Sequence, residues 1–136
     1  MTEYDRGILD TSVVVSLETY EAAQLPETPF ITTITLAELS AGPLLAADST
    51  ERAARQARLQ EVEATFDPLP FDAAAARAFA RIRLALASAG KDLKPRALDA
   101  LIASVALAAE LPLFTANARD MPTTEGLDVV ELRPSD

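Results

Sequence analysis

Short apolar runs alternate along the first third of the chain with segments of helical periodicity. An apolar run predicts a strand over residues 8–10, followed by a helix that Thr11 or Ser12 is placed to cap. A second strand is expected near residues 30–32. A helix that carries Glu38 should follow it and should bend or end at the next Gly-Pro pair, because proline interrupts helical hydrogen bonding. The same order, strand and then helix, thus occurs twice.

Three more helices are predicted further along the chain. Residues 48–66 alternate in charge, which indicates a solvent-facing helix with a capping signal at Asp48 or Ser49. Residues 72–90 predict a strong helix, with aspartate as its N-cap and glycine as its C-terminal stop. Pro95 suits the first turn of a third helix, because proline has no amide hydrogen to satisfy there.

The remaining apolar runs are short and bounded by turn residues, which predicts strands. They lie between two prolines at 67–71, within 111–121, where the strand runs into a turn, and at 127–132, before a tail at 133–136. Strands that alternate with helices indicate a mostly parallel sheet covered on both faces. We therefore expect an α/β fold, a three-layer α/β/α arrangement, in one domain over 1–136 with its core at about 7–132.

The amino-acid composition excludes several kinds of catalytic chemistry. The chain has no histidine and no cysteine, which excludes histidine acid/base catalysis, thiolate nucleophiles and cysteine zinc sites. Its four glycines are too scattered for a phosphate-binding glycine loop. No apolar run approaches the ~20 residues that a membrane span needs, and no secretory signal is visible at the N-terminus. We expect a soluble, cytoplasmic protein in which carboxylates do any chemistry.

Three carboxylates stand alone in otherwise uncharged segments. They are Asp10, Glu38 and Asp99. Each has a simple structural explanation as a helix cap or as an acid favoured by a helix dipole. Strand ends and helix starts converge at one edge of a parallel α/β sheet, however, and clustered carboxylates repel unless a cation neutralises them. Together they predict a site for a hard cation, Mg²⁺ or Mn²⁺.

A fourth polar group follows the strand predicted within 111–121. Thr115, Asn117 and Asp120 come at the end of that strand and in the turn after it. Asparagine and aspartate are ordinary turn formers, so a structural role and a place in the site are both open for them.

Four motifs in this order resemble the PIN-domain ribonucleases, and among them the VapC-type toxins of toxin–antitoxin pairs. The motifs are "ILDTS", "TLAEL", "RALDALIASVA" and "FTANARDM". The resemblance implies metal-dependent hydrolysis of RNA, with Asp10, Glu38, Asp99 and Asp120 as catalytic acids and Asp10 and Asp99 as principal metal ligands. It leaves the fourth acid open between Asp120 and Asn117, with Asp120 as first choice.

The resemblance also implies supporting groups. Ser12 and Thr115 match small hydroxyl positions of the family, with Asn117 as a further candidate.

The net charge of −9 disfavours a nucleic-acid partner, but the basic residues are unevenly distributed. Half of them form a local basic stripe: Arg77, Arg81, Arg83, Lys91, Lys94 and Arg96. Within it, Arg77, Arg81 and Arg96 are candidate contacts for RNA phosphates, or else solvated charges on helix faces.

Partners follow from the resemblance as well. VapC-type toxins are usually homodimers neutralised by a small cognate antitoxin, whose C-terminal segment often places an arginine among the acids. The alanine- and leucine-rich residues 36–47 are a candidate groove for that segment, although packing against the sheet would also explain them. Two alternatives remain: a housekeeping PIN-type RNA-processing nuclease, and a phospho-acceptor or binding module without nuclease activity.

Overall fold

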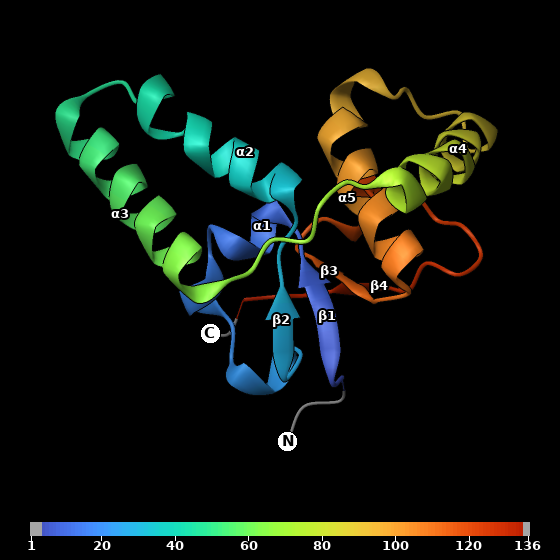
Figure 1. The fold of residues 1–136 in the computed structure, drawn as a ribbon, viewed down its shortest axis with the longest axis horizontal. Helices are drawn as coiled ribbons and strands as arrows, with labels where there is room; N and C mark the ends of the chain where they lie inside the picture. Colours follow the sequence, from blue (N-terminus) through green and yellow to red (C-terminus); the bar gives the residue numbers. More distant parts are fainter. Residues whose placement is uncertain (1–3, 135–136) are drawn as a thin grey trace.

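The computed structural model describes residues 4–134. These residues form one four-stranded sheet with helices packed on both of its faces (Figure 1). The predicted tail is therefore described only to Pro134, and its last two residues lie outside the described part. All neighbouring strands run parallel, in the order β2-β1-β3-β4. The strands are β1 (Arg6–Leu9), β2 (Thr28–Phe30), β3 (Leu113–Thr115) and β4 (Val129–Glu131).

Five α-helices and five short 3₁₀ helices connect the strands. The α-helices are α1 (Thr11–Val14), α2 (Thr33–Ala41), α3 (Ser49–Thr65), α4 (Ala73–Ser88) and α5 (Ala97–Ala109). The 3₁₀ helices are η1 (Leu17–Thr19), η2 (Ala22–Gln24), η3 (Pro43–Leu45), η4 (Lys94–Arg96) and η5 (Ala118–Asp120). Among the described residues no helix is long and apolar enough to cross a membrane.

Two apolar cores lie on opposite faces of the sheet. Ile8 and Leu113 face the core formed with α4 and α5, whereas the next residues along their strands, Leu9 and Phe114, face the core with α1, α2 and α3. This alternation follows from the twofold side-chain period of a strand. Figure 1 shows the two helical groups on either side of the sheet. The prediction of a three-layer α/β/α arrangement is confirmed.

Helix ends that depend on local chemistry were predicted correctly. Asp48 and Asp72 cap α3 and α4, each by accepting a hydrogen bond from the backbone N–H three residues on. Gly90 has a left-handed φ of 71° just beyond α4. The N–H of Gly90 donates to Ala87 O and that of Lys91 to Leu86 O, the double closure of a Schellman motif, which turns the chain back beside the helix.

Several predicted boundaries were wrong. Residues 67–71 do not form a strand, because Leu69 makes only one isolated bridge, to Thr32. The strand expected at 30–32 lies two residues earlier. Pro95 belongs to η4 and not to α5. The cap of α1 is neither of the two hydroxyl residues but the aspartate before them, which bears directly on the site.

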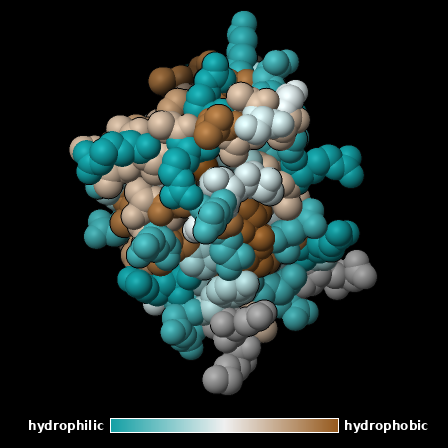
Figure 2. All heavy atoms as spheres, turned by 90° about the vertical axis from the view of Figure 1, so that its right-hand side faces the viewer, coloured by the Kyte–Doolittle hydropathy of each residue, from teal (hydrophilic) through white to brown (hydrophobic). Residues whose placement is uncertain are grey.

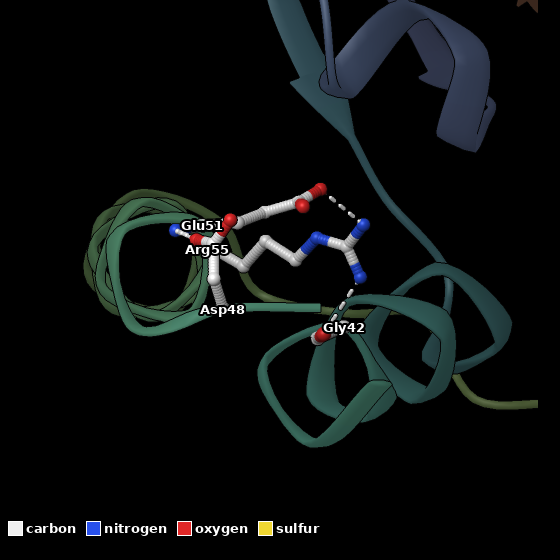
Figure 3. A network of polar contacts seen from close by, with 4 residues as sticks. All are labelled: Gly42, Asp48, Glu51 and Arg55. Carbon is white, nitrogen blue, oxygen red and sulfur yellow. Dashed lines mark hydrogen bonds and ion pairs between the residues drawn. The ribbon is translucent and has the colours of Figure 1, made fainter. Parts of the chain in front are cut away.

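The helices α2 and α3 form a hairpin-like pair held by one arginine (Figure 3). Arg55 of α3 donates to the carbonyl oxygen of Gly42, the C-cap of α2, at 2.9 Å. Its other terminal nitrogen pairs with Glu51 at 2.5 Å. Both terminal nitrogens of this guanidinium therefore have partners inside the protein, and the end of α2 is tied to the first turns of α3.

Candidate active site

Asp10 lies at the carboxyl end of β1 and is only 2% exposed. Its Oδ1 accepts hydrogen bonds from Val13 N at 3.2 Å, which makes it the N-cap of α1, and from Ser12 Oγ at 2.5 Å. Burial raises the pKa of Asp10 above its ordinary value, while the hydrogen bonds from Ser12 and Thr115 oppose that rise. The cap of α1 and the candidate metal ligand are thus the same residue.

Ser12 joins the ends of the two central strands. Its Oγ donates to Asp10 and accepts from the backbone N–H of Ala116 at 3.1 Å. Thr115, at the end of β3, is fully buried and is the second hydroxyl bound to Asp10. Two of the three residues expected to support the site, Ser12 and Thr115, therefore contact its most buried acid.

Glu38 reaches the site from α2 through a chain of hydroxyl groups. Thr11 Oγ1 donates to Glu38 Oε1 at 2.6 Å. Because a hydroxyl has one proton to give, the 2.9 Å contact between Thr11 and Thr35 has Thr35 as its donor. The first turn of α2 contains no acid, so the helix-dipole explanation of Glu38 is wrong.

Thr11 and Thr35 were missed by sequence reasoning. Thr35 is fully buried, and it precedes Glu38 by three residues on the same helix, so the two share a face. That spacing was a visible signal, but the partner hydroxyl on α1 comes from a distant part of the chain.

Asp99 lies in the first turn of α5 and is partly buried. Desolvation first, and then the charges of Asp10, Glu38 and Asp120, together raise its pKa from 3.8 to about 6, whereas Arg96 opposes the rise. Each of these three acids therefore lies within electrostatic range of Asp99.

Of the two candidates for the fourth group, Asp120 is the one whose charge acts on Asp99. Its Oδ1 lies 3.8 Å from a terminal nitrogen of Arg96. Asn117 is exposed, and its side-chain amide makes no hydrogen bond with the described residues; only its backbone N–H is bound, to Thr115 Oγ1 at 3.0 Å. Asp120 is exposed as well, so the choice of Asp120 over Asn117 stays a prediction, supported by the effect of its charge on Asp99.

The three arginines expected to contact RNA differ in their surroundings. Arg96 is largely buried: it donates to Asp92 O at 3.2 Å, lies beside Asp120, and its Nε has no partner among the described residues. Arg81 donates to the carbonyl oxygen of Glu125 in the loop before β4. Arg77 is exposed on α4. Only Arg96 has a contact with one of the four acids.

The acid cluster has the donors that a hard cation needs but does not form a closed cage. Within residues 4–134, no group of three or more acidic side chains is arranged to hold a metal ion. Mg²⁺ is usually bound through one or two carboxylates and several waters, so a full protein cage is not required. Mutual repulsion at Asp99 also makes a cation favourable there. The residues present fit a partly hydrated divalent ion.

A parallel α/β/α sheet with acids gathered at its carboxyl edge defines a class of small nucleic-acid-cleaving domains. The PIN domain family matches residues 8–125, and the chain belongs to that family. PIN-domain ribonucleases generally depend on a divalent metal ion.

Named relatives make the comparison more specific. Ribonuclease VapC5 of Mycobacterium tuberculosis is 40% identical over 129 residues, which cover 93% of each chain. Ribonuclease VapC8 of the same species is 37% identical over 101 residues, covering 74% of this chain and 89% of VapC8. A crystal structure of VapBC-5, a toxin–antitoxin system of M. tuberculosis, superimposes with a TM-score of 0.80 at 35% identity and covers 94% of this chain and 99% of that one. The resemblance read from the four motifs is confirmed.

Proposed function

We propose that this chain is a Mg²⁺-dependent endoribonuclease and the toxin of a VapBC-type toxin–antitoxin pair. The observation that carries the proposal is that three acids from separate parts of the chain, Asp10, Glu38 and Asp120, all act through their charges on Asp99. Likeness to two named VapC ribonucleases supports a toxin over a housekeeping nuclease. Membership of the PIN family argues against the phospho-acceptor alternative.

The chain's own residues have distinct tasks in this proposal. Asp10 and Asp99 would hold the cation, which when bound acidifies water and polarises a phosphoryl oxygen. Glu38 is oriented by Thr11 through Oε1, which leaves its other oxygen to accept a proton from the attacking water. Asp120, held beside Arg96, completes the negative site. Mn²⁺ offers the same hard-oxygen preference and would substitute for Mg²⁺.

Cleavage of RNA by the purified protein tests this assignment. Total bacterial RNA should be cut in the presence of Mg²⁺, and a chelator should stop cleavage. Asp99→Asn should be inactive, because a neutral amide removes a charged ligand while keeping the side chain's shape. The matched control is Asp67→Asn, since Asp67 is exposed and has no hydrogen bond or ion pair with the described residues. Equal cleavage by wild type and Asp99→Asn would refute the site.

We also propose that the antitoxin covers the tip of the α2–α3 pair. Within the predicted groove at 36–47, Leu39 and Pro43 are buried in the protein, so packing explains that part. Leu44 and Leu45 in η3 are 80% and 75% exposed, and such adjacent apolar side chains suit a protein partner. The related VapBC-5 structure is that of a toxin–antitoxin system.

Binding of the cognate antitoxin, the product expected from a short neighbouring reading frame, tests this surface. Leu44→Ser with Leu45→Ser should weaken that binding by at least tenfold and leave RNA cleavage unchanged. Leu84→Ser on α4, which is 67% exposed, is the matched control. Undiminished binding by the double variant would refute this surface. Sedimentation of the purified protein would separately test the proposed homodimer.

A further inference from the structure

An open hollow of about 780 Å³ lies where α4 ends and the chain turns towards α5. Three basic side chains line it, those of Arg83, Lys91 and Lys94, together with a single acid, Asp92. The chain as a whole has 21 acidic and 12 basic residues. The side chains that line this hollow therefore carry a net positive charge, whereas the chain as a whole carries a net negative charge.

The backbone of this region explains how residues distant along the chain share the hollow. The left-handed Gly90 reverses the chain after α4, so that residues 91–95 return beside the last turns of the helix. Lys91 and Lys94 thereby join Arg83. The carbonyl end of a helix favours nearby cations, which gives the two lysines a structural reason to be there, but Arg83 lies before the last turn of α4 and caps nothing.

Two of the three basic side chains that line the hollow have no polar partner among the described residues. Arg83 and Lys94 are exposed, and neither makes a hydrogen bond or an ion pair with the described residues. Lys91 Nζ donates to the carbonyl oxygen of Arg119 at 2.8 Å. The positive charge in the hollow is thus free to meet an anion from outside.

The hollow and the acid cluster are connected through η5 and through the loop that carries Asp92. Arg119, which Lys91 binds, belongs to η5, the same 3₁₀ helix that carries Asp120. The loop residue Asp92 lines the hollow, while its carbonyl oxygen accepts from Arg96, which lies 3.8 Å from Asp120 on the other side. An RNA strand bound at the acids would therefore reach the hollow by passing over η5 and the loop that carries Asp92.

We infer that this basic hollow binds phosphates of the RNA strand next to the phosphate that is cleaved. The inference rests on the proposed function. A single strand carries a charge at every nucleotide, and unpaired Arg and Lys side chains are what binds it without reading its sequence. A second hollow, between α1 and α3, is lined by two acids, Glu18 and Glu61, and one base, Arg58, which disfavours an RNA path on that side.

A protein partner is the competing occupant. Figure 2 shows apolar patches between hydrophilic side chains on the side of the molecule where α4 lies, and Leu84 of α4 is 67% exposed. Contact with a second copy would bury apolar surface there, and the acidic chain would also offer carboxylates to Arg83 and Lys94. The experiment below separates the two occupants.

The test compares two double variants that each remove two exposed cations. Arg83→Gln with Lys94→Gln removes two of the three positive charges that line the hollow. Lys91 is kept because its hydrogen bond to Arg119 O holds η5. Arg6→Gln with Arg52→Gln is the control: both side chains are exposed and lie outside the hollow. Binding of a labelled mixed-sequence single-stranded RNA is measured with chelator at several NaCl concentrations, and cleavage of total bacterial RNA is measured with Mg²⁺.

The hollow variant should bind the RNA about tenfold more weakly at low salt. Its dependence of log affinity on log salt should be shallower by about 1.4, because each lost phosphate contact removes about 0.7 on a single strand. In cleavage, KM should rise while kcat stays near that of wild type. The control variant should match wild type in both assays.

Unchanged affinity and salt dependence in the hollow variant would overturn the inference. So would RNA binding equal to wild type together with loss of self-association or antitoxin binding, since the hollow would then be a protein interface. If the wild type cuts no RNA, the proposed nuclease function fails, and the binding assay in chelator still decides whether the hollow takes RNA.

Discussion

Replacing Asp99 with asparagine should make the metal-free protein more stable at neutral pH while abolishing cleavage. Asp99 is partly buried beside three other acids, and these surroundings raise its pKa from 3.8 to about 6. Above pH 6 the folded protein must therefore hold a carboxylate that is more favourable in the unfolded chain. The amide of asparagine has nearly the same shape but no charge, so the substitution raises the free energy of unfolding.

The size of the gain follows from the shift in pKa. Each unit is worth about 1.4 kcal/mol, so a shift of about two units corresponds to at most about 3 kcal/mol. The side chain is partly exposed, and solvent screening reduces this to about 1 kcal/mol. For a domain of this size the gain should raise Tm by about 3–5 °C.

The sign of the pH dependence is also determined. Because the folded-state pKa is raised, the folded protein binds more protons than the unfolded chain between pH 4 and 6, and this group's contribution to stability falls as pH rises through that window. The difference in Tm between Asp99→Asn and wild type should be near zero at pH 4 and largest at pH 7.

Thermal unfolding in chelator at several pH values and low salt measures this difference, with Asp67→Asn as the control that should follow wild type. Addition of Mg²⁺ should raise the Tm of wild type more than that of Asp99→Asn, since the variant has lost a ligand. An Asp99→Asn protein that is less stable than wild type at pH 7 in chelator would show that burial of the Asp99 charge, with repulsion from the other acids, is not the dominant effect at this position.

Three further changes test the fold and the site separately. Gly7→Ala should destabilise the protein by about 1–3 kcal/mol, because a Cβ there would collide with the ring of Phe114; an unchanged urea midpoint would contradict this. Thr11→Val should lower kcat about tenfold with little change in KM, since Glu38 loses the donor that orients it, and a change in KM alone would assign Thr11 to substrate binding. Asp72→Ala should cost about 1 kcal/mol in thermal unfolding through loss of the α4 cap, with no effect on cleavage.

Features set by neighbouring residues were predictable from the sequence. Asp48 and Asp72 were recognised as caps and Gly90 as a stop because capping depends on the residue and the three or four that follow or precede it. Asp10, Glu38 and Asp99 were recognised for a related reason, since a lone charge in an apolar segment is visible without knowing its partners, whereas Asp120 was named from the family resemblance. Their convergence followed from the parallel sheet.

Features set by contacts between distant segments were not predictable. The sequence offered Thr11 and Ser12 as caps of α1, but both hydroxyls are committed elsewhere, to Glu38 and to Asp10. Thr35 matters only because α1 and α2 lie side by side. Residues 67–71 have a strand's composition but find a single bridge in place of a strand partner.

The strand order bears on how the protein is made. The strand β3 lies between β1 and β4 at the centre of the sheet, and the bond from Ala116 to Ser12 joins residues 104 positions apart. During synthesis, the amino-terminal segments that carry Asp10 and Glu38 leave the ribosome long before Asp120 does. The growing chain thus cannot assemble the acid cluster before β3 and Asp120 have been made, and until then the ribosome that makes a proposed RNA-cutting protein is not exposed to an assembled site.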